Sequence, residues 1–287
     1  MTRQLMPAAF LGHGSPMNAV ERNRFTEAWR TFGASVPRPR AILAVSAHWH
    51  VDALAVTAMP HPRTIHDFFG FPQALFDVQY PAPGLPQLAE EIADLVAPDF
   101  IAGADHDGWG LDHGTWGVLV HAFPNADIPV VQLSLDARKP LDWHLALGAR
   151  LAPLRERGIL VVGSGNVVHN LRAIDWLNPD GAIDWNARFD ADTRALMAER
   201  PHDLAALAGH RDYRMAVPTD EHFLPLLYLA GLAAAADAPA DVLVEGPAYG
   251  SLSMTAFTVG APELPVPASG EGAAPIASDV PPEAANV

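Results

Sequence analysis

Cysteine is absent from the 287-residue chain. Its absence excludes disulfide bonds, thiolate zinc sites and cysteine nucleophiles, so histidine, aspartate and glutamate remain as the strong metal ligands. Basic residues are scarce, 18 against 33 acidic ones, and the net charge of −15 argues against nucleic acid or an anionic membrane as a partner. No segment reaches the roughly 18 apolar residues of a membrane span, and the N-terminus lacks a signal-peptide pattern. We therefore expect a soluble cytoplasmic protein.

Apolar residues make up 49% of the chain and charged residues 18%, which is typical of a globular protein with a substantial core. Strand-like apolar runs alternate with segments of helical spacing. This order predicts a three-layer α/β fold, in which a central, mostly parallel or mixed β-sheet is flanked by helices. No linker divides residues 1–260, so we expect one domain there. Residues 261–287 are rich in proline, alanine and acidic residues, and we expect this tail to be disordered or loosely packed.

The stretch from residue 41 to 50, A-I-L-A-V-S-A-H-W-H, predicts a short buried strand that ends at His48. Two other predicted strands are each followed by a histidine near a glycine-rich turn: Met6–Leu11 by His13, and Ile159–Val162 by His169. If the three strands are parallel neighbours, their carboxyl ends meet at one edge of the sheet, where ligand sites of such sheets lie. A single such histidine is more often a core or capping residue, and that interpretation stays open beside a metal site. Three on separate strands are harder to explain in this way.

The residue types suit a metal site with an open position. Neutral imidazole binds zinc and iron well, and structural zinc sites usually rely on thiolates, which this chain lacks. Two other interpretations have weaker support. The G-S-G-N turn at residues 163–166 lacks the spacing of a phosphate-binding loop, and Ser15 and Ser164 do not lie in the G-x-S-x-G pattern of a nucleophilic serine.

Six motifs follow one another along the chain: L-G-H-G-S-P-M-N, S-A-H-W, T-I-H-D-F-x-G-F-P, D-H-G-T-W, G-S-G-N-V-V-H-N-L and E-H-F-L-P-L-L-Y. As an ordered set they resemble the DODA-type extradiol aromatic ring-opening dioxygenases, which belong to the class III, LigB-like superfamily. The resemblance runs from Pro7 to Gly260. It implies a LigB-like version of the α/β fold, with one catalytic domain over residues 1–260.

The resemblance also implies roles for individual residues. The metal centre maps onto four histidines: His13, His48, His169 and His222. The implied catalytic histidines are His113 and His169, and the implied substrate-binding residues are His66, Asp67, Phe68 and Trp116. Fe(II) is the metal expected for activity, and Zn(II) is possible as a bound metal because an all-histidine site also suits zinc.

Two residues near this set stay unassigned at the level of the sequence. Members of the wider superfamily hold Fe(II) with two histidines and one glutamate, so Glu221, adjacent to His222, is a possible carboxylate ligand. His50 points to the same side of its strand as His48 and can approach the site.

The implied reaction is extradiol ring opening of a catechol, such as DOPA or a related catecholic acid, with O2. A zinc-dependent hydrolase that uses the same imidazoles to activate water is one alternative. A non-catalytic binding protein on the same scaffold is another. In each case the expected partner is a small molecule, without nucleic acid or membrane, and the chain is expected to be a monomer or a small homo-oligomer.

Overall fold

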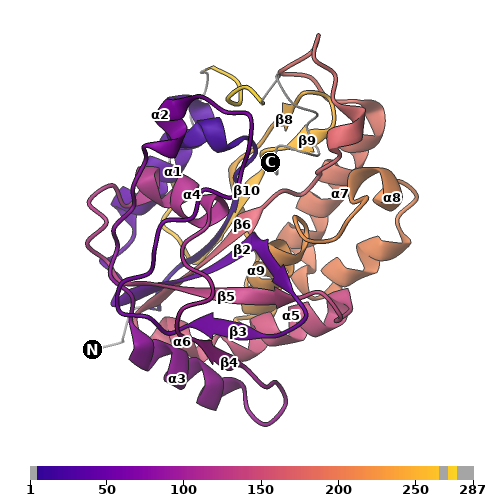
Figure 1. Ribbon diagram of the computed structural model, residues 1–287. Helices are drawn as coiled ribbons and strands as arrows, with labels where there is room; N and C mark the ends of the chain where they lie inside the picture. Colours follow the sequence, from indigo (N-terminus) through magenta and orange to yellow (C-terminus); the bar gives the residue numbers. More distant parts are fainter. Residues whose placement is uncertain (1–4, 265–270, 277–287) are drawn as a thin grey trace.

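The computed structural model describes residues 5–264 and 271–276, and it is built around one large β-sheet (Figure 1). Among these residues, eight strands form the sheet in the order β4-β3-β5-β2-β6-β1-β10-β7. Their bounds are β1 (Ala8–Gly12), β2 (Ala41–Val51), β3 (Ala55–Thr57), β4 (Gly103–Asp105), β5 (Val130–Asp136), β6 (Ile159–Gly165), β7 (Asp241–Val244) and β10 (Ala256–Val259). A small separate pair is formed by β8 (Pro247–Ala248) and β9 (Leu252–Ser253).

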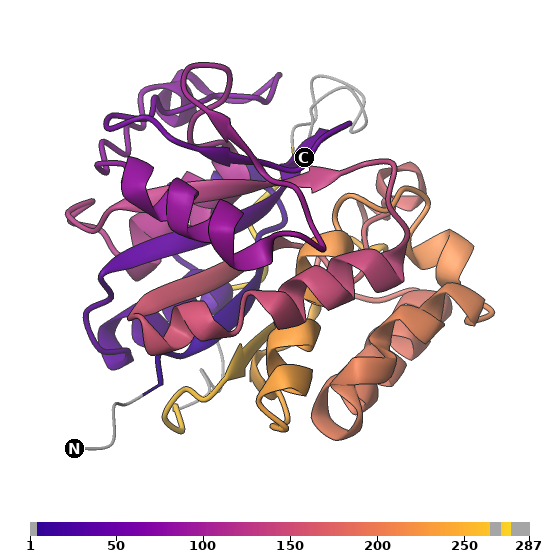
Figure 2. The ribbon, with the colours of Figure 1, turned by 90° about the horizontal axis from the view of Figure 1, so that it is seen from below.

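Helices cover both faces of the sheet (Figures 1 and 2). One face packs against α1 (Arg24–Ser35) and α4 (His113–Ala122). The other packs against α3 (Pro86–Val96), α5 (Leu141–Arg150) and α9 (Leu224–Ala235). Successive side chains of a strand point to opposite faces, so Ile42 belongs to the first core and Leu43 to the second. The predicted three-layer α/β fold is therefore confirmed.

The remaining helical segments lie between these elements or at the sheet's margins. They are the α-helices α2 (Gln73–Phe76), α6 (Pro153–Glu156), α7 (Asp184–Glu199) and α8 (Tyr213–Ala216), and the 3-10 helices η1 (Pro16–Ala19), η2 (Leu171–Ala173) and η3 (Pro201–Gly209). Within the described part of the chain, no helix has the length and apolar character that crossing a membrane requires.

The three strands predicted to carry histidines are neighbours. β6 lies between β2 and β1 and is parallel to both. The register pairs Gly12 with Gly165, and Ser46 with Ser164, so the three strands reach the same edge of the sheet together. This arrangement brings the residues that follow them into one region.

β2 is longer than the sequence predicts. It does not end at His48 but continues to Val51, because its last residues pair with β5, where His50 lies opposite Leu135. The pairing with β5 is irregular between Val45 and His50, as in a β-bulge. His48 therefore sits within an interrupted stretch of the strand, where the backbone can turn its side chain toward β1.

Part of the tail packs against the domain. Ser15 Oγ donates a hydrogen bond to the carbonyl oxygen of Pro275 (2.5 Å), and the backbone N–H of Ala274 donates to Asn18 Oδ1 (3.1 Å). Ala274 and Ile276 are buried. Residues 271–276 therefore contact the domain through buried apolar side chains and backbone hydrogen bonds. Residues 265–270 and 277–287 of the predicted tail lie outside the described residues.

Candidate active site

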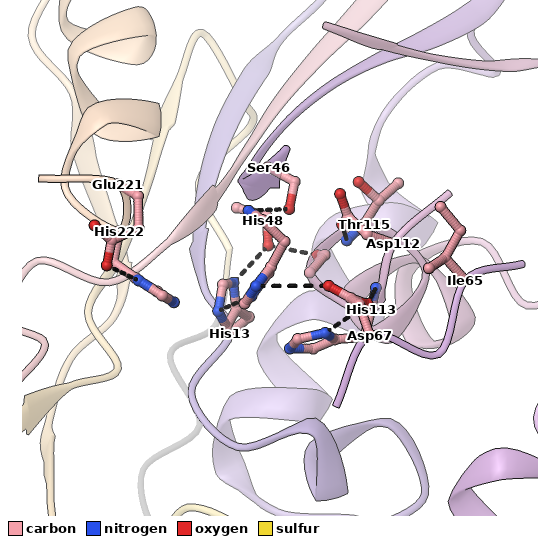
Figure 3. Close-up of polar contacts among 12 residues, drawn as sticks. His13, Ser46, His48, Ile65, Asp67, Asp112, His113, Thr115, Glu221 and His222 are labelled. Atoms are coloured by element: carbon pink, nitrogen blue, oxygen red, sulfur yellow. Dashed lines mark hydrogen bonds and ion pairs between the residues drawn. The ribbon is translucent and has the colours of Figure 1, made fainter. Parts of the chain in front are cut away.

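Five imidazoles gather at the carboxyl edge of β1, β2 and β6. His13 follows β1, His48 lies in β2, His113 is the first residue of α4, His169 follows β6, and His222 precedes α9. The Nε2 atoms of His13 and His48 are 3.3 Å apart. The ring centres of His48 and His113 are 3.9 Å apart, and His169 stacks on His222 at 3.5 Å. Figure 3 shows His13 and His48 between His222 on one side and His113 on the other.

Two glycines allow the backbone to form this cluster. Gly14 has a φ of +55°, a left-handed conformation that a side chain would strain, and it turns the chain directly after His13. Gly165 lies at the end of β6 against the backbone of His222. A Cβ at Gly165 would be 2.2 Å from the carbonyl oxygen of His222, which also accepts a hydrogen bond from Asn166 N (2.9 Å). The glycine-rich motifs therefore serve close backbone approach rather than phosphate binding.

Three of the imidazoles have their Nδ1 atoms held by side chains outside the cluster. The pairs are His13 Nδ1 with Ser164 Oγ (3.0 Å), His113 Nδ1 with Asp67 Oδ1 (2.9 Å), and His222 Nδ1 with Glu221 Oε1 (3.2 Å). Ser164 donates its own proton to the carbonyl oxygen of Gly114 (2.5 Å), so toward His13 it acts as an acceptor. Each of these rings therefore turns its Nε2 atom toward the interior of the cluster.

Electrostatics favour neutral rings at His13 and His48, and ionised carboxylates at Asp67 and Glu221. Burial, together with the neighbouring imidazoles, holds the pKa of His13 and of His48 well below its ordinary value. Burial alone raises the pKa of Asp67, but the charge of His113 and the hydrogen bonds that it donates lower that pKa overall. The pKa of Glu221 is likewise raised by burial and lowered overall by the hydrogen bond and charge of His222. In their neutral form His13 and His48 keep lone pairs that can bind a cation.

A third carboxylate fixes the start of α4. Asp112 is fully buried and caps the helix, because its Oδ1 accepts from the backbone N–H of Thr115 (3.0 Å). Its Oδ2 accepts from Trp109 Nε1 (3.1 Å) and from Gln132 Nε2. Burial and the charge of Asp67 raise the pKa of Asp112. Asp112 had no role predicted from the sequence, although D-H-G-T is the pattern of a capped helix start.

The donor set fits a divalent metal ion. The Nε2 atoms of His113 and His222 are buried and have no hydrogen-bond partner among the described residues, and those of His13 and His48 face each other. Two groups have ligand atoms close enough together to hold an ion: His13 with His48 and His113, and His169 with Glu221 and His222. Buried nitrogen atoms that converge without donors to satisfy them are the chemistry that zinc and iron prefer.

A cavity of about 390 Å³ opens beside the cluster. This volume lies in the range of small-molecule sites. The cavity is lined by Ala47, His48, His50, His169, Asn170, Leu171, Arg172, Pro218, Thr219, Glu221 and His222. Arg172 is the one arginine or lysine among these residues. The cavity thus joins three imidazoles of the cluster to a single cationic side chain.

The four residues expected to bind substrate do not line this cavity. Phe68 and Trp116 are fully buried, and Trp116 Nε1 donates to the carbonyl oxygen of Ile65 (2.8 Å). His66 donates from Nε2 to the carbonyl oxygen of Val78 (2.8 Å), and Asp67 binds His113. The T-I-H-D-F segment therefore lies outside the lining of this cavity. Its aromatic side chains pack into the core beside α4, since burying them is more favourable than exposing them in a cavity.

Two residues that the sequence left open or overlooked line the cavity instead. His50, the second residue beyond His48, does so because β2 continues past His48. Arg172, in η2, had no role predicted from the sequence. The available signal was its position three residues after His169, directly beyond the matched motif.

Comparison with known proteins agrees with this geometry. Residues 7–257 match the family described as "Catalytic LigB subunit of aromatic ring-opening dioxygenase". A protein of Escherichia coli K12 named "4,5-DOPA dioxygenase extradiol" is 48% identical over 91% of this chain and 97% of its own length. One of the same name from Beta vulgaris is 37% identical over 78% of this chain and 85% of its own length. The crystal structure of an uncharacterized protein of Escherichia coli K12 superimposes with a TM-score of 0.77, at 43% identity, over 88% of this chain and 99% of that one.

The fold and the histidine cluster thus define an aromatic ring-opening dioxygenase, and the chain belongs to the LigB family of these enzymes. Within that family it is of the DODA type, an extradiol ring-opening dioxygenase.

Proposed function

We propose that the enzyme opens the ring of a catecholic acid, such as DOPA or a related compound, with O2 and Fe(II). The observation that carries this proposal is the cavity, which reaches from the buried imidazoles to Arg172. A planar catechol is small enough for such a volume. The relatives named 4,5-DOPA dioxygenase support the choice of substrate class.

The proposed metal ligands are His13, His48, His169 and His222. Bound Fe(II) would bring the catechol oxygens and O2 together and pass electron density between them. The proposed catalytic histidines are His169 on the cavity side and His113 on the opposite side of His48. A neutral imidazole can accept a proton from a catechol hydroxyl through its free lone pair. His13, His113, His169 and His222 are buried, which limits the access of water to the reacting groups.

Arg172 gives the cavity its proposed preference for acids. The guanidinium group has five N–H donors in a fixed plane and binds carboxylates in a bidentate manner. It lies at the same cavity as the imidazoles that would bind the ring. A substrate with a diol at one end and a carboxylate on its side chain is complementary to both.

The function is tested by loading the metal-free protein with Fe(II) under anaerobic conditions and then adding O2 with a panel of catechols. The panel contains DOPA, caffeate and uncharged 4-methylcatechol. We expect O2 uptake and a yellow ring-opened product with the two acids. If the fully loaded protein consumes no O2 with any catechol, the proposal is wrong.

The zinc-loaded protein serves as the control, and we expect it to consume no O2. Hydrolysis of esters or amides by this form would instead favour a zinc hydrolase. Neither activity, combined with ligand binding that survives metal removal, would favour a binding protein.

A further inference from the structure

Two carboxylates face the imidazole cluster from opposite sides. Asp67 approaches His113 and Glu221 approaches His222, each at the Nδ1 atom of the ring (Figure 3). The sequence had suggested other roles for both, substrate binding for Asp67 and metal binding for Glu221. The hydrogen-bond geometry instead favours a third role, in which each carboxylate orients a histidine ring.

An ionised carboxylate can only accept hydrogen bonds, so the ring nitrogen that contacts it must carry the proton. In His113 and His222 that nitrogen is Nδ1, so in the neutral ring the lone pair lies on Nε2. Both Nε2 atoms are buried and without a hydrogen-bond partner among the residues described. The tautomer that the carboxylates select therefore presents two lone pairs at buried positions of the cluster.

We propose that Asp67 and Glu221 are positioning residues, which fix His113 and His222 as Nδ1–H tautomers so that each Nε2 lone pair faces the cluster. Neither carboxylate is then a metal ligand or a substrate contact. They supply negative charge to an all-imidazole site through hydrogen bonds. An acceptor of this kind raises the basicity of the ring that it holds.

Asp67 is itself held firmly in place. Its Oδ1 accepts a second hydrogen bond from the backbone N–H of His113 (3.0 Å). The loop that carries it is fastened to the start of α4, because Ile65 N donates to the carbonyl oxygen of Leu111 (2.7 Å) and Trp116 Nε1 donates to the carbonyl oxygen of Ile65 (2.8 Å). Asp67 Oδ2 lies 3.7 Å from His48 Nδ1, beyond hydrogen-bond distance, so His113 is its principal imidazole partner.

Glu221 is held on the other side. Its Oε1 accepts from Thr219 Oγ1 (2.8 Å) as well as from His222 Nδ1 (3.2 Å). The backbone of His222 is fixed independently by the hydrogen bond from Asn166 N to its carbonyl oxygen (2.9 Å). With the ring oriented and its Nδ1 satisfied, the free direction of His222 is toward His13, whose ring centre is 5.3 Å away.

The first test reads the tautomers directly in the metal-free wild-type protein. Histidine labelled with ¹⁵N and long-range ¹H–¹⁵N correlation spectra report which ring nitrogen carries the proton, and His113→Gln and His222→Gln assign the two signals. We expect the Nδ1–H form in both rings. A predominant Nε2–H form in either ring overturns the proposal for that carboxylate, and this measurement depends neither on turnover nor on a stable variant.

The second test removes the carboxylates. In Glu221→Ala, His222 should no longer be held in the Nδ1–H form, and the affinity for Zn(II) should fall about 10- to 100-fold. Glu221→Asp should recover part of this affinity. The absorption spectrum of the Co(II)-loaded protein should stay unchanged in Glu221→Ala. A spectral change would show that Glu221 is a direct ligand, and unchanged zinc affinity would show that it does not act on the site.

In Asp67→Ala, His113 should no longer be held in the Nδ1–H form, and kcat with DOPA should fall about 100-fold while KM changes little. Asp67→Glu should recover part of kcat. This kinetic expectation rests on the proposed function. A raised KM with unchanged kcat would instead identify Asp67 as a substrate contact. If the wild-type enzyme does not turn over catechols, the proposed function fails, while the tautomer spectra and zinc affinities still decide this inference.

Asp192→Ala provides the matched control. Asp192 Oδ2 also lies 2.9 Å from an imidazole nitrogen, Nε2 of His210, but this pair lies outside the cluster and Asp192 is exposed. Its removal should leave zinc affinity, kcat and the tautomers of His113 and His222 as in the wild type. A loss as large as in the two test variants would show that the effects are not specific to the site.

Discussion

Replacing Gly165 by alanine tests whether the histidine cluster depends on close backbone packing. The added Cβ would lie 2.2 Å from the carbonyl oxygen of His222, whereas ordinary contacts begin at 3.4 Å. Backbone on both sides leaves no flexible side chain to move away, so β6 and the His222 turn must separate by about 1 Å. The hydrogen bond from Asn166 N to His222 O (2.9 Å) would be lost or weakened.

The expected cost combines two effects. Overpacking contributes about 1–3 kcal/mol. Loss of the buried hydrogen bond would lower the free energy of unfolding by about another 1–3 kcal/mol. A total near 3 kcal/mol lowers the melting temperature of a domain of this size by about 6–12 °C. Because His222 moves with its backbone, Zn(II) affinity should fall, and kcat should fall about 100-fold, although no proposed ligand has been removed.

Gly209→Ala is the control, because a Cβ at Gly209 meets nothing within 4 Å. Its melting temperature should stay within about 2 °C of the wild type. The measurements are thermal unfolding of the metal-free protein, zinc competition against a chelator, and O2 uptake after Fe(II) loading. If Gly165→Ala matches the control in melting temperature and zinc affinity, the inferred role of the close approach is wrong.

Three further predictions concern single side chains. His13→Ala and His48→Ala should each abolish metal retention, measured by elemental analysis after dialysis; full occupancy in either variant would contradict the proposed ligand set. Arg172→Ala should raise KM about 10- to 100-fold for caffeate and DOPA but not for 4-methylcatechol, because only the acids lose a charge-assisted hydrogen bond; equal effects on all three would refute carboxylate recognition. Burial, followed by smaller effects of its neighbours, lowers the pKa of His144 from 6.5 to about 4, so the unfolded chain binds a proton first as pH falls. The contribution of neutral His144 to the free energy of unfolding is present above pH 6.5 and declines toward pH 4. Between pH 7 and pH 5, the free energy of unfolding measured in urea should fall by about 2 kcal/mol more in the wild type than in His144→Asn. Parallel pH profiles of the two proteins would disprove this.

The motifs were sufficient to predict the family and the gathering of His13, His48 and His169. Each of these histidines follows or lies in an apolar strand, and parallel neighbouring strands end at one edge of the sheet. The local sequence pattern was therefore enough to predict that side chains distant in sequence lie close together. His222 was assigned only through the resemblance, because a histidine near a helix start has no distinguishing periodicity. His113 lies in a glycine-rich turn of the sequence, but its role also came from the resemblance. The structure brings both to the cluster by the close approach at Gly165 and by the Asp112 cap of α4.

Which side of the cluster opens to a ligand was decided by the tertiary structure alone. Phe68 and Trp116, two of the predicted substrate-binding residues, are buried in the core, and the cavity lies beside His50 and Arg172. A sequence specifies which residues are apolar and which carry imidazoles or carboxylates. It does not specify which surface each one meets, because burial and hydrogen-bond direction depend on chain segments that are far apart in sequence, as Asp67 and His113 are.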